Sequence, residues 1–416
     1  MTPVLNGIRQ PLALLAAVNA GVLRLARDPR TTGVLGAGPR VGRFLYESAR
    51  SGHGLDTDVG DSPFRPTARM AAEALIDEVL ISLFHHPDLV PRDEDFAPAA
   101  ADLTAAHTLF TRRGWLGRPE TYHRDPPPPT EVLVREGKVL GLSYEGLTFS
   151  SGWEPTAKEP GRERWLSHEA NRTAHVWVSR AAGTGGPWLI AAHGFGMGRS
   201  PFIDLRAFWT PMLHRMGINI AVPVMPLHGA RASGRVRGED LMTIDMVDSM
   251  HGVAQGVWDM RRVIRWVRST QGATNIGIIG YSFGALVAAL VASLEVDLAC
   301  VIAGIPLVDL PQLFRQHSGP HTSRLAAQHG VLGHAADEVH RVVSPLAMTC
   351  KVPFDRRFLF AGRGDRMSTF GQAVTLWQHW GRPSLLAYPG SHVGFFFSRS
   401  VRGYVEEALK ATLMPS

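Results

Sequence analysis

A serine at position 282 stands between two glycines in the segment Gly-Tyr-Ser-Phe-Gly at 280–284. An apolar run at 275–280 precedes it, and a second, alanine-rich run begins at Phe283. This pattern is typical of a strand, a tight turn and a helix, with the turn projecting the hydroxyl above the end of a sheet. Glycines are needed there because a Cβ would collide with neighbouring backbone. Ser282 is therefore a candidate nucleophile; the alternative is an ordinary strand–turn–helix that contains a serine.

A serine hydroxyl needs a base that accepts its proton as it attacks. His392 is the best placed of the eighteen histidines, because it lies in a loop just past the last apolar run of strand length. The imidazolium that forms needs a carboxylate, and Asp365 ends the preceding run. The chain order Ser282, Asp365, His392 predicts a catalytic triad. Asp309, just after the run at 298–306, is the alternative acid.

The tetrahedral intermediate of acyl transfer needs N–H donors for its negatively charged oxygen. The segment His-Gly-Phe-Gly at 193–196 follows another apolar run, and its glycines allow the backbone to bend. We expect the N–H of Phe195 to be one donor. The second is expected to be the N–H of Phe283, at a helix N-terminus. His193 is expected to hold this loop by a hydrogen bond and not to act as a base.

Large side chains beside these motifs could contact a substrate. The principal candidates are Met197, Tyr281 and Phe395, and the wider set adds Phe202, Trp209, Met225, Phe396 and Phe397. For each of them, packing in the core explains the sequence equally well.

The elements that must position these residues follow a regular pattern beyond residue 183. Runs of strand length alternate with helical ones, which predicts an α/β fold with a parallel sheet and crossover helices. Strands are expected at 131–136, 144–151, 173–180, 187–193, 218–226, 275–280, 298–306, 357–365 and 383–392. Helices are expected at about 204–216, at 248–269, from 283 onward and at 400–413. An irregular insertion is expected at about 307–352.

Residues 1–125 have a different character, helical and irregular, with 67–84 the clearest amphipathic helix. A proline-rich segment at 124–130 predicts a boundary between this helical extension and a domain at 131–416. We expect the extension to act as a cap or as an oligomer contact. The glycine-rich segment 36–42 follows no strand, so it is not expected to bind phosphate.

Composition restricts the classes of function. The 416 residues are 45% hydrophobic and 19% charged, a globular balance. The net charge of +6 comes almost entirely from arginine, without a basic run that would bind nucleic acid. Arginine-rich composition explains this charge; mild attraction to anionic lipids or substrates is the alternative.

Cofactors and metals are not expected. Two cysteines build neither a disulfide framework nor a metal site. The histidine pairs at 85–86 and at 317 and 321 lack the pattern of a zinc site.

The apolar run at 11–23 is too short to span a bilayer and is interrupted by Asn19. An amphipathic helix and a cytoplasmic location are therefore expected; a signal peptide and secretion are the alternative. No transmembrane segment is expected, although peripheral membrane contact and the oligomeric state stay open.

Taken together, the four motifs at 193–196, 280–284, 362–365 and 390–392 resemble the α/β-hydrolase superfamily. The likeness covers roughly 131–416. It implies a mostly parallel sheet with nucleophile, acid and base at the carboxyl ends of strands, and a cofactor-independent serine hydrolase acting on small-molecule carboxylic esters through an acyl-enzyme.

Two segments, 226–234 and 258–267, are more weakly similar to the branch of dienelactone hydrolases, acetyl esterases and acyl-peptidases. Peptidases, thioesterases, acyltransferases and carbon–carbon hydrolases would use the same triad. A non-catalytic binding or scaffold protein is the alternative of a different class.

Overall fold

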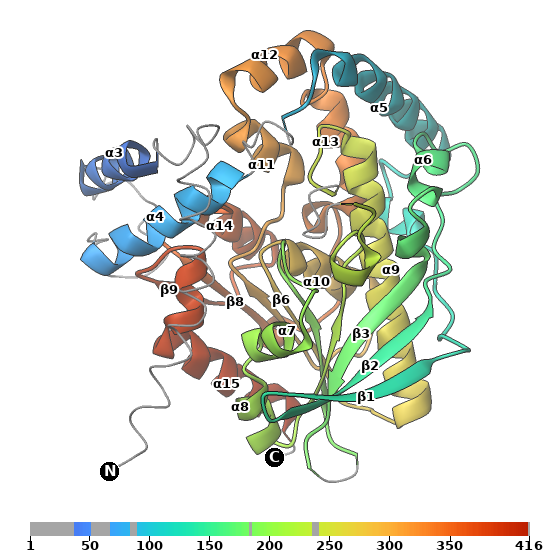
Figure 1. Ribbon diagram of the computed structural model, residues 1–416, viewed down its shortest axis with the longest axis vertical. Coiled ribbons are helices and arrows are strands. Elements are labelled where there is room, and N and C mark those ends of the chain that lie inside the picture. Colours follow the sequence, from blue (N-terminus) through green and yellow to red (C-terminus); the bar gives the residue numbers. More distant parts are fainter. Residues whose placement is uncertain (1–36, 51–66, 84–89, 183–184, 235–240, 415–416) are drawn as a thin grey trace. The chain divides into compact units, whose positions relative to one another are not determined.

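The computed structural model describes residues 37–50, 67–83, 90–182, 185–234 and 241–414 (Figure 1). The apolar run at 11–23 and the histidine pair at 85–86 lie outside these residues. Two compact units make up the chain. The first comprises Met1–Val90, Gly362–Thr369 and Ala387–Arg402. The second comprises Pro91–Ala361, Phe370–Leu386 and Gly403–Ser416.

A nine-stranded sheet has the order β1-β2-β3-β5-β4-β6-β7-β8-β9. Its strands are β1 Leu133–Val139, β2 Leu142–Ser150, β3 Thr173–Ser179, β4 Trp188–Ala192, β5 Asn219–Pro223, β6 Ile276–Tyr281, β7 Cys300–Gly304, β8 Arg357–Gly362 and β9 Ser384–Tyr388. β1, β2 and β3 form an antiparallel meander whose last strand also pairs antiparallel with β5. From β5 through β4, β6 and β7 to β8 all pairs are parallel. This mostly parallel sheet confirms the expected α/β-hydrolase fold.

The parallel strands are apolar throughout because both faces of the sheet are covered. Every residue of β4, β5, β6 and β7 is buried, as expected for strands between two layers of helices. After β4 the chain forms β5, the neighbour of β4 on one edge, and then crosses over β4 to form β6, its neighbour on the other edge. Right-handed crossovers therefore place α7 and α8 on one face and α9 and α10 on the other, as Figure 1 shows. Their bounds are α7 Pro201–Ala207, α8 Thr210–Arg215, α9 Met246–Gln271 and α10 Phe283–Leu294.

Two predictions of local structure are wrong. The single helix expected at about 204–216 is two helices, because Trp209 adopts a left-handed conformation with φ of 51° and interrupts it. The insertion at 307–352 is not irregular. It contains three helices, α11 Leu310–His317, α12 Pro320–His329 and α13 His334–His340. Residues at the helix ends set their limits: Asp309 caps the start of α11, and Gly330 ends α12 in a left-handed conformation.

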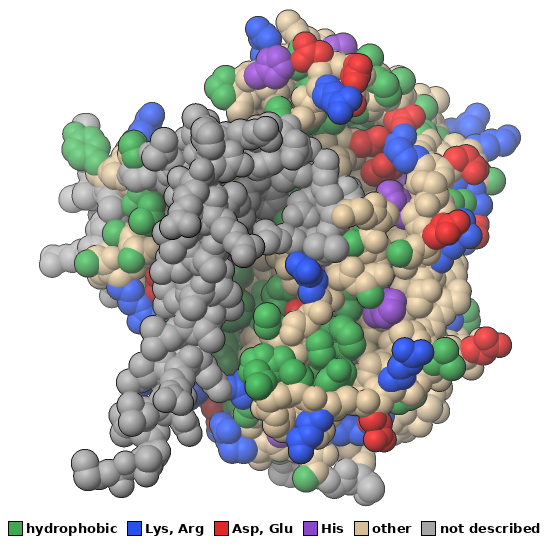
Figure 2. All heavy atoms as spheres, in the orientation of Figure 1, with side chains coloured by type: hydrophobic (Ala, Val, Ile, Leu, Met, Phe, Trp, Pro, Cys, Tyr) green, Lys and Arg blue, Asp and Glu red, His purple; other side chains and the backbone are tan. Residues whose placement is uncertain are grey.

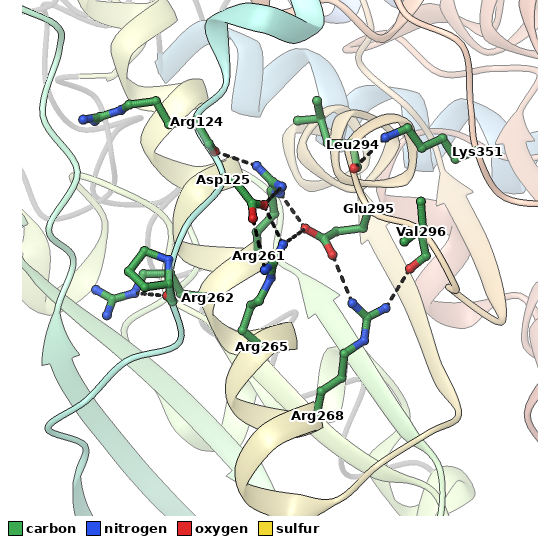
Figure 3. Close-up of polar contacts among 11 residues, drawn as sticks. Arg124, Asp125, Arg261, Arg262, Arg265, Arg268, Leu294, Glu295, Val296 and Lys351 are labelled. Carbon is green, nitrogen blue, oxygen red and sulfur yellow. Dashed lines mark hydrogen bonds and ion pairs between the residues drawn. The ribbon is translucent and has the colours of Figure 1, made fainter.

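The proline-rich segment at 124–130 is held against α9 (Figure 3). Arg261 donates to the carbonyl of Arg124 at 2.8 Å and to the carboxylate of Asp125 at 2.7 Å. The same guanidinium reaches Glu295, just beyond α10, at 2.7 Å. These contacts tie the segment to two helices of the second unit, which also contains α5 Asp93–Arg113. The two compact units divide the chain at other residues than the expected boundary. The division into domains at 1–125 and 131–416 therefore stays a prediction.

The first unit is built on α3 Ala37–Arg50 and α4 Ala68–Leu83. Glu78 on α4 joins two parts of this unit. It pairs with Arg40 of α3 at 2.6 Å and with Arg366, in the loop after β8, at 3.0 Å. Among the described residues, the other α-helices are α6 Arg162–Leu166, α14 Thr369–His379 and α15 Arg399–Leu413. Within the described ranges, none of the helices has the length and apolarity to cross a bilayer.

Candidate active site

Ser282 occupies a strained turn between β6 and α10. Its φ of 56° is rare for a residue with a side chain, and such conformations cost about 1–3 kcal/mol. The surrounding backbone holds it there. The N–H of Ser282 donates to the carbonyl of Gly304 on β7 at 3.0 Å, and its own carbonyl accepts from Leu307 at 3.3 Å. The side chain is partly exposed, as a nucleophile requires.

The two glycines of this turn are there because the backbone is crowded. A Cβ on Gly280 would lie 2.2 Å from the carbonyl oxygen of Gly284, and a Cβ on Gly284 would lie 2.1 Å from that of Ala192. Neither contact can be relieved by a side-chain rotation, because each oxygen belongs to the backbone. The close approach expected from sequence is confirmed, and it lets β4, β6 and α10 converge beside Ser282.

Gly284→Ala is therefore expected to lower the free energy of unfolding by about 3 kcal/mol or more, measured by urea denaturation of the full chain. Gly403 provides the matched control, because it lies inside α15 with no atom within 4 Å of the position of a Cβ. Gly403→Ala is expected to leave stability unchanged or raise it by up to about 1 kcal/mol. Equal stabilities for the two variants would show that the turn can relax.

The loop after β4 lies directly against this turn. A Cβ on Gly194 would lie 3.7 Å from the Cβ of Ser282. His193 fixes the loop, since its Nδ1 donates to the carbonyl of Gly194 at 2.8 Å and its Nε2 accepts from the N–H of Met225 at 2.9 Å. Burial lowers the pKa of His193 to about 4, so the ring is neutral and can play both roles at once. The structural role expected for His193 is confirmed.

A buried carboxylate that sequence reasoning missed also shapes this loop. Asp204 accepts from the N–H of Gly198 at 3.0 Å, the N–H of Ser200 at 3.2 Å and the indole of Trp177 at 3.2 Å. Burial raises the pKa of Asp204 to about 6, against the lowering effect of these N–H bonds. Its position at the start of α7, six residues past a glycine-rich loop, was the available signal.

The two expected oxyanion donors lie on the turn of Ser282 and on the loop after β4. Phe283 is the first residue of α10, where N–H groups have no partner inside the helix. Phe195 is half-buried and directly follows Gly194, where an added Cβ would lie 3.7 Å from the Cβ of Ser282. His228, also missed from sequence, packs edge-on against Phe195 at 5.4 Å and stacks on Phe283 at 6.3 Å between ring centroids. His228 thus couples both segments by packing, and the donor roles stay a prediction.

Burial and the neighbouring His193 lower the pKa of His228 to about 3. Its Nδ1 therefore donates to the carbonyl of Pro226 at 2.8 Å, and its Nε2 has no hydrogen-bond partner among the described residues.

The first unit brings together the predicted acid and base. His392 Nδ1 lies 2.7 Å from a carboxylate oxygen of Asp365, and both side chains are buried. The other oxygen of Asp365 accepts from the N–H groups of Met367 at 2.8 Å and Ser368 at 2.9 Å. This arrangement fixes the tautomer in which Nδ1 carries the proton and Nε2 can act as a base. Asp309, the alternative acid, instead caps α11 by accepting from Gln312 at 2.8 Å.

Burial alone would lower the pKa of His392. The charge of Asp365 and the hydrogen bond to it outweigh that effect, so the pKa is raised above its usual value. The pair therefore favours the imidazolium form that a catalytic histidine must adopt during acyl transfer.

The expected substrate-contacting residues lie in different surroundings. Tyr281 is buried and stacks on Phe208 with 4.5 Å between ring centroids. Phe395 is also buried, with its ring against that of Phe396. Met197 is only half-buried. The apolar side chains around α7 are more exposed, as Figure 2 shows, and they include Ile203 with 49% of its surface exposed. A substrate-binding role stays a prediction for all of them.

A cavity of about 230 Å³ lies between α9, α10 and the insertion, within the second unit. Leu286, one turn beyond Ser282 on α10, forms part of its wall, together with Val308. Val308 directly follows the residue whose N–H binds the carbonyl of Ser282. The rest of the wall mixes apolar side chains with ionisable ones, which are Asp309, Arg315, Asp337, His340 and Arg341. Across the described residues, His, Cys, Asp and Glu side chains form no group of three that could hold a metal ion.

Two proteins of Mycobacterium tuberculosis match nearly the whole chain. "Uncharacterized protein MT2702" of strain CDC 1551 / Oshkosh is 39% identical over 385 residues, which is 92% of each chain. "Uncharacterized protein Rv2627c" of strain ATCC 25618 / H37Rv is 38% identical over the same share. The chain belongs to the family of these two proteins. Because the match covers 92% of the chain, it includes most of residues 1–125, and the N-terminal segment is part of what the relatives share. No protein-family model matches the chain.

Solved structures of lower similarity are members of the α/β-hydrolase superfamily. Acetyl xylan esterase 1 from Thermoanaerobacterium sp. JW/SL YS485 is 13% identical with a TM-score of 0.48, over 71% of this chain and 93% of that one. The acetyl xylan esterase of Paenibacillus sp. R4 is 14% identical with a TM-score of 0.48, over 70% and 98%. The acylaminoacyl peptidase of Pyrococcus horikoshii is 13% identical with a TM-score of 0.43, over 69% and 42%.

Proposed function

We propose that this protein is a serine hydrolase that cleaves a carboxylic ester of a small molecule through an acyl-enzyme. One observation carries the proposal: a serine in a strained turn stands beside a glycine-rich loop, in a fold that also holds a buried Asp–His pair. Strain of this kind persists only where the surrounding structure enforces it, and it concentrates at functional sites.

The positions of three strands support the proposal that Ser282, Asp365 and His392 act together. Ser282 follows β6, Asp365 follows β8 and His392 follows β9, and these strands belong to one sheet. β8 and β9 are joined through α14, the type of connection that parallel strands need. Ligands of open α/β sheets bind outside the carboxyl ends of the strands, where such loops gather.

The proposed reaction has two halves. His392 Nε2 removes the proton of Ser282 Oγ as this oxygen attacks the acyl carbon, and Asp365 stabilises the resulting imidazolium. The N–H groups of Phe195 and Phe283 hold the negative oxygen of the tetrahedral intermediate. The imidazolium then gives its proton to the leaving alcohol. A water molecule attacks the acyl-enzyme with His392 again as base, which releases the acid and restores Ser282.

The reaction can be tested with p-nitrophenyl esters from acetate to laurate, beside the anilide and thioester of the best acyl group. We expect hydrolysis of the ester to have the highest kcat/KM and to be absent in Ser282→Ala. Faster cleavage of the anilide or thioester would reassign the enzyme to a peptidase or a thioesterase. No cleavage of any of these compounds by the folded protein would contradict the proposal.

The cavity beside α10 is the proposed site of the group attached to the reacting carbonyl, because its wall reaches Leu286. Ala347 lines this cavity and is half-buried, so Ala347→Phe can fill it without entering the core. We expect kcat/KM for the longest accepted acyl chain to fall about tenfold or more, with little change for acetate. An unchanged chain-length profile would show that the cavity does not bind substrate.

A further inference from the structure

A third carboxylate lies against the predicted acid and base. Asp77, on α4 of the first unit, is completely buried. One of its oxygens accepts from the N–H of His392 at 2.9 Å and from the N–H of Arg366 at 3.1 Å. The other accepts from the hydroxyl of Ser391 at 3.1 Å and from the N–H of Val393 at 3.3 Å. All the donors belong to the loops that carry Asp365 and His392.

These contacts fix the backbone on which the acid–base pair depends. Arg366 directly follows Asp365, so one carboxylate oxygen of Asp77 bridges the acid loop and the base itself. Hydrogen bonds from backbone N–H groups to an ionised carboxylate are among the stronger ones in proteins. A catalytic pair must be held to within about 0.5 Å, and two loops joined through one rigid helix meet that requirement better than two independent loops.

A second carboxylate of α4 reinforces the same docking. Glu73, one helical turn before Asp77, accepts from the N–H of Ser391 at 3.1 Å. The base loop is adapted to it, because a Cβ at Gly390 or at Gly394 would come within 3 Å of the Glu73 carboxylate. Helix α4 therefore contacts the base loop closely along two consecutive turns.

Charged groups of both signs surround Asp77. Asp365, Glu73 and Glu78 are the neighbouring acids, and Arg366 and His392 are the neighbouring bases. Arg69 pairs with Glu73 at 2.7 Å and Arg40 pairs with Glu78 at 2.6 Å. Burial and the charge of Asp365 raise the pKa of Asp77 to about 7, against the lowering effects of His392 and of the N–H donors. Conversely, the charge of Asp77 helps to raise the pKa of His392. A positive charge on His392 is thus stabilised from two sides.

We propose that Asp77 is a positioning residue for His392: it joins the acid and base loops and acts as a second carboxylate that stabilises the imidazolium. The inference rests on the proposed function and gives α4 a part in the chemistry, where the sequence predicted only a cap or an oligomer contact.

The first test measures the titration of His392 and needs no activity. In the full chain labelled with ¹⁵N, the imidazole signals of His392 are identified by their loss in His392→Gln. We expect Asp77→Asn to lower the pKa of His392 by about one unit, because one of two nearby negative charges is removed. Glu78→Gln is the matched control, since this neighbouring carboxylate pairs with Arg40 and Arg366. Equal titration of His392 in Asp77→Asn and in wild type would overturn the inference.

Wild type alone also tests the coupling, should Asp77→Asn fail to fold. Because Asp77 contacts the backbone of His392 at 2.9 Å, the two groups should titrate as an interacting pair, and the His392 signals should depart from a single-site titration curve. A titration of His392 that follows a single-site curve throughout would overturn the inference.

The second test uses the ester identified above. Neutral His392 is the active base, so activity is lost as the pH falls through its pKa. In Asp77→Asn the pKa of His392 should be lower, so the fall of kcat/KM on the acid side of the pH profile should occur at lower pH than in wild type. We also expect kcat to fall about tenfold with KM unchanged. Asp77→Glu should return the acid side of the profile to its wild-type position. If Asp77→Asn lost activity without moving the acid side of the profile, Asp77 would have only a structural role. Inactive wild type would contradict the proposed function instead, and the titration would still decide the role of Asp77.

Discussion

Ser282→Ala is expected to reduce kcat for ester hydrolysis by roughly 10⁶-fold, to the level of the buffer reaction with the protein present. The hydroxyl oxygen forms the acyl bond in the proposed mechanism, and no neighbouring group on the turn can replace it. Alanine keeps the Cβ and therefore the strained conformation, so the fold should be unaffected. Steady-state kinetics with the best p-nitrophenyl ester, together with a thermal melt that matches wild type, measure this effect. A residual rate within tenfold of wild type would exclude Ser282 as the nucleophile.

Asp365→Asn is expected to lower kcat by about 10⁴-fold. An amide at this position can donate to His392 Nδ1, which moves the remaining proton to Nε2 and leaves the histidine unable to act as a base. The substitution acts directly on His392 because the two side chains are in contact at 2.7 Å. The measurement is kcat for the same ester, with chemical shifts of His392 to report the change of tautomer.

Asp309→Asn is the matched control for this substitution. Asp309 caps α11 through Gln312, and asparagine is an equally good cap, so kcat should stay within about threefold of wild type. A severe loss in Asp309→Asn combined with a mild one in Asp365→Asn would assign the acid to the strand-β7 loop.

Sequence predicts the parts of this site that depend on local chemistry. The apolar strands, the crowded glycines around Ser282 and the hydrogen-bonding role of His193 all have signatures within a few residues. Such signatures can be recognised in the sequence because the backbone conformation of a tight turn accepts few residue types. The chain order of acid and base was also readable, and the 2.7 Å contact between them confirms that this pair comes together.

The contacts that sequence missed join residues far apart in the chain. Asp77 and His392 are separated by 315 residues, and no spacing rule connects them. A signal did exist, since Asp77 lies among apolar residues in α4, and a carboxylate is rarely buried completely without partners. The insertion helices were missed for another reason. These helices are short, with 8, 10 and 7 residues, so each offers only two or three turns in which a hydrophobic period can be recognised. The caps at Asp309 and Gly330 were the local signals that could have marked them.

Labelling with a fluorophosphonate, followed by mass spectrometry of the intact protein and of its peptides, tests the central claim most directly. Fluorophosphonates react with a serine whose proton is removed by an adjacent base, so the readout depends on the whole site and not on the choice of substrate. We predict a single adduct on the peptide that contains Ser282, and none in Ser282→Ala. No adduct on the folded wild-type protein, or equal labelling of Ser282→Ala, would contradict the assignment of this protein as a serine hydrolase.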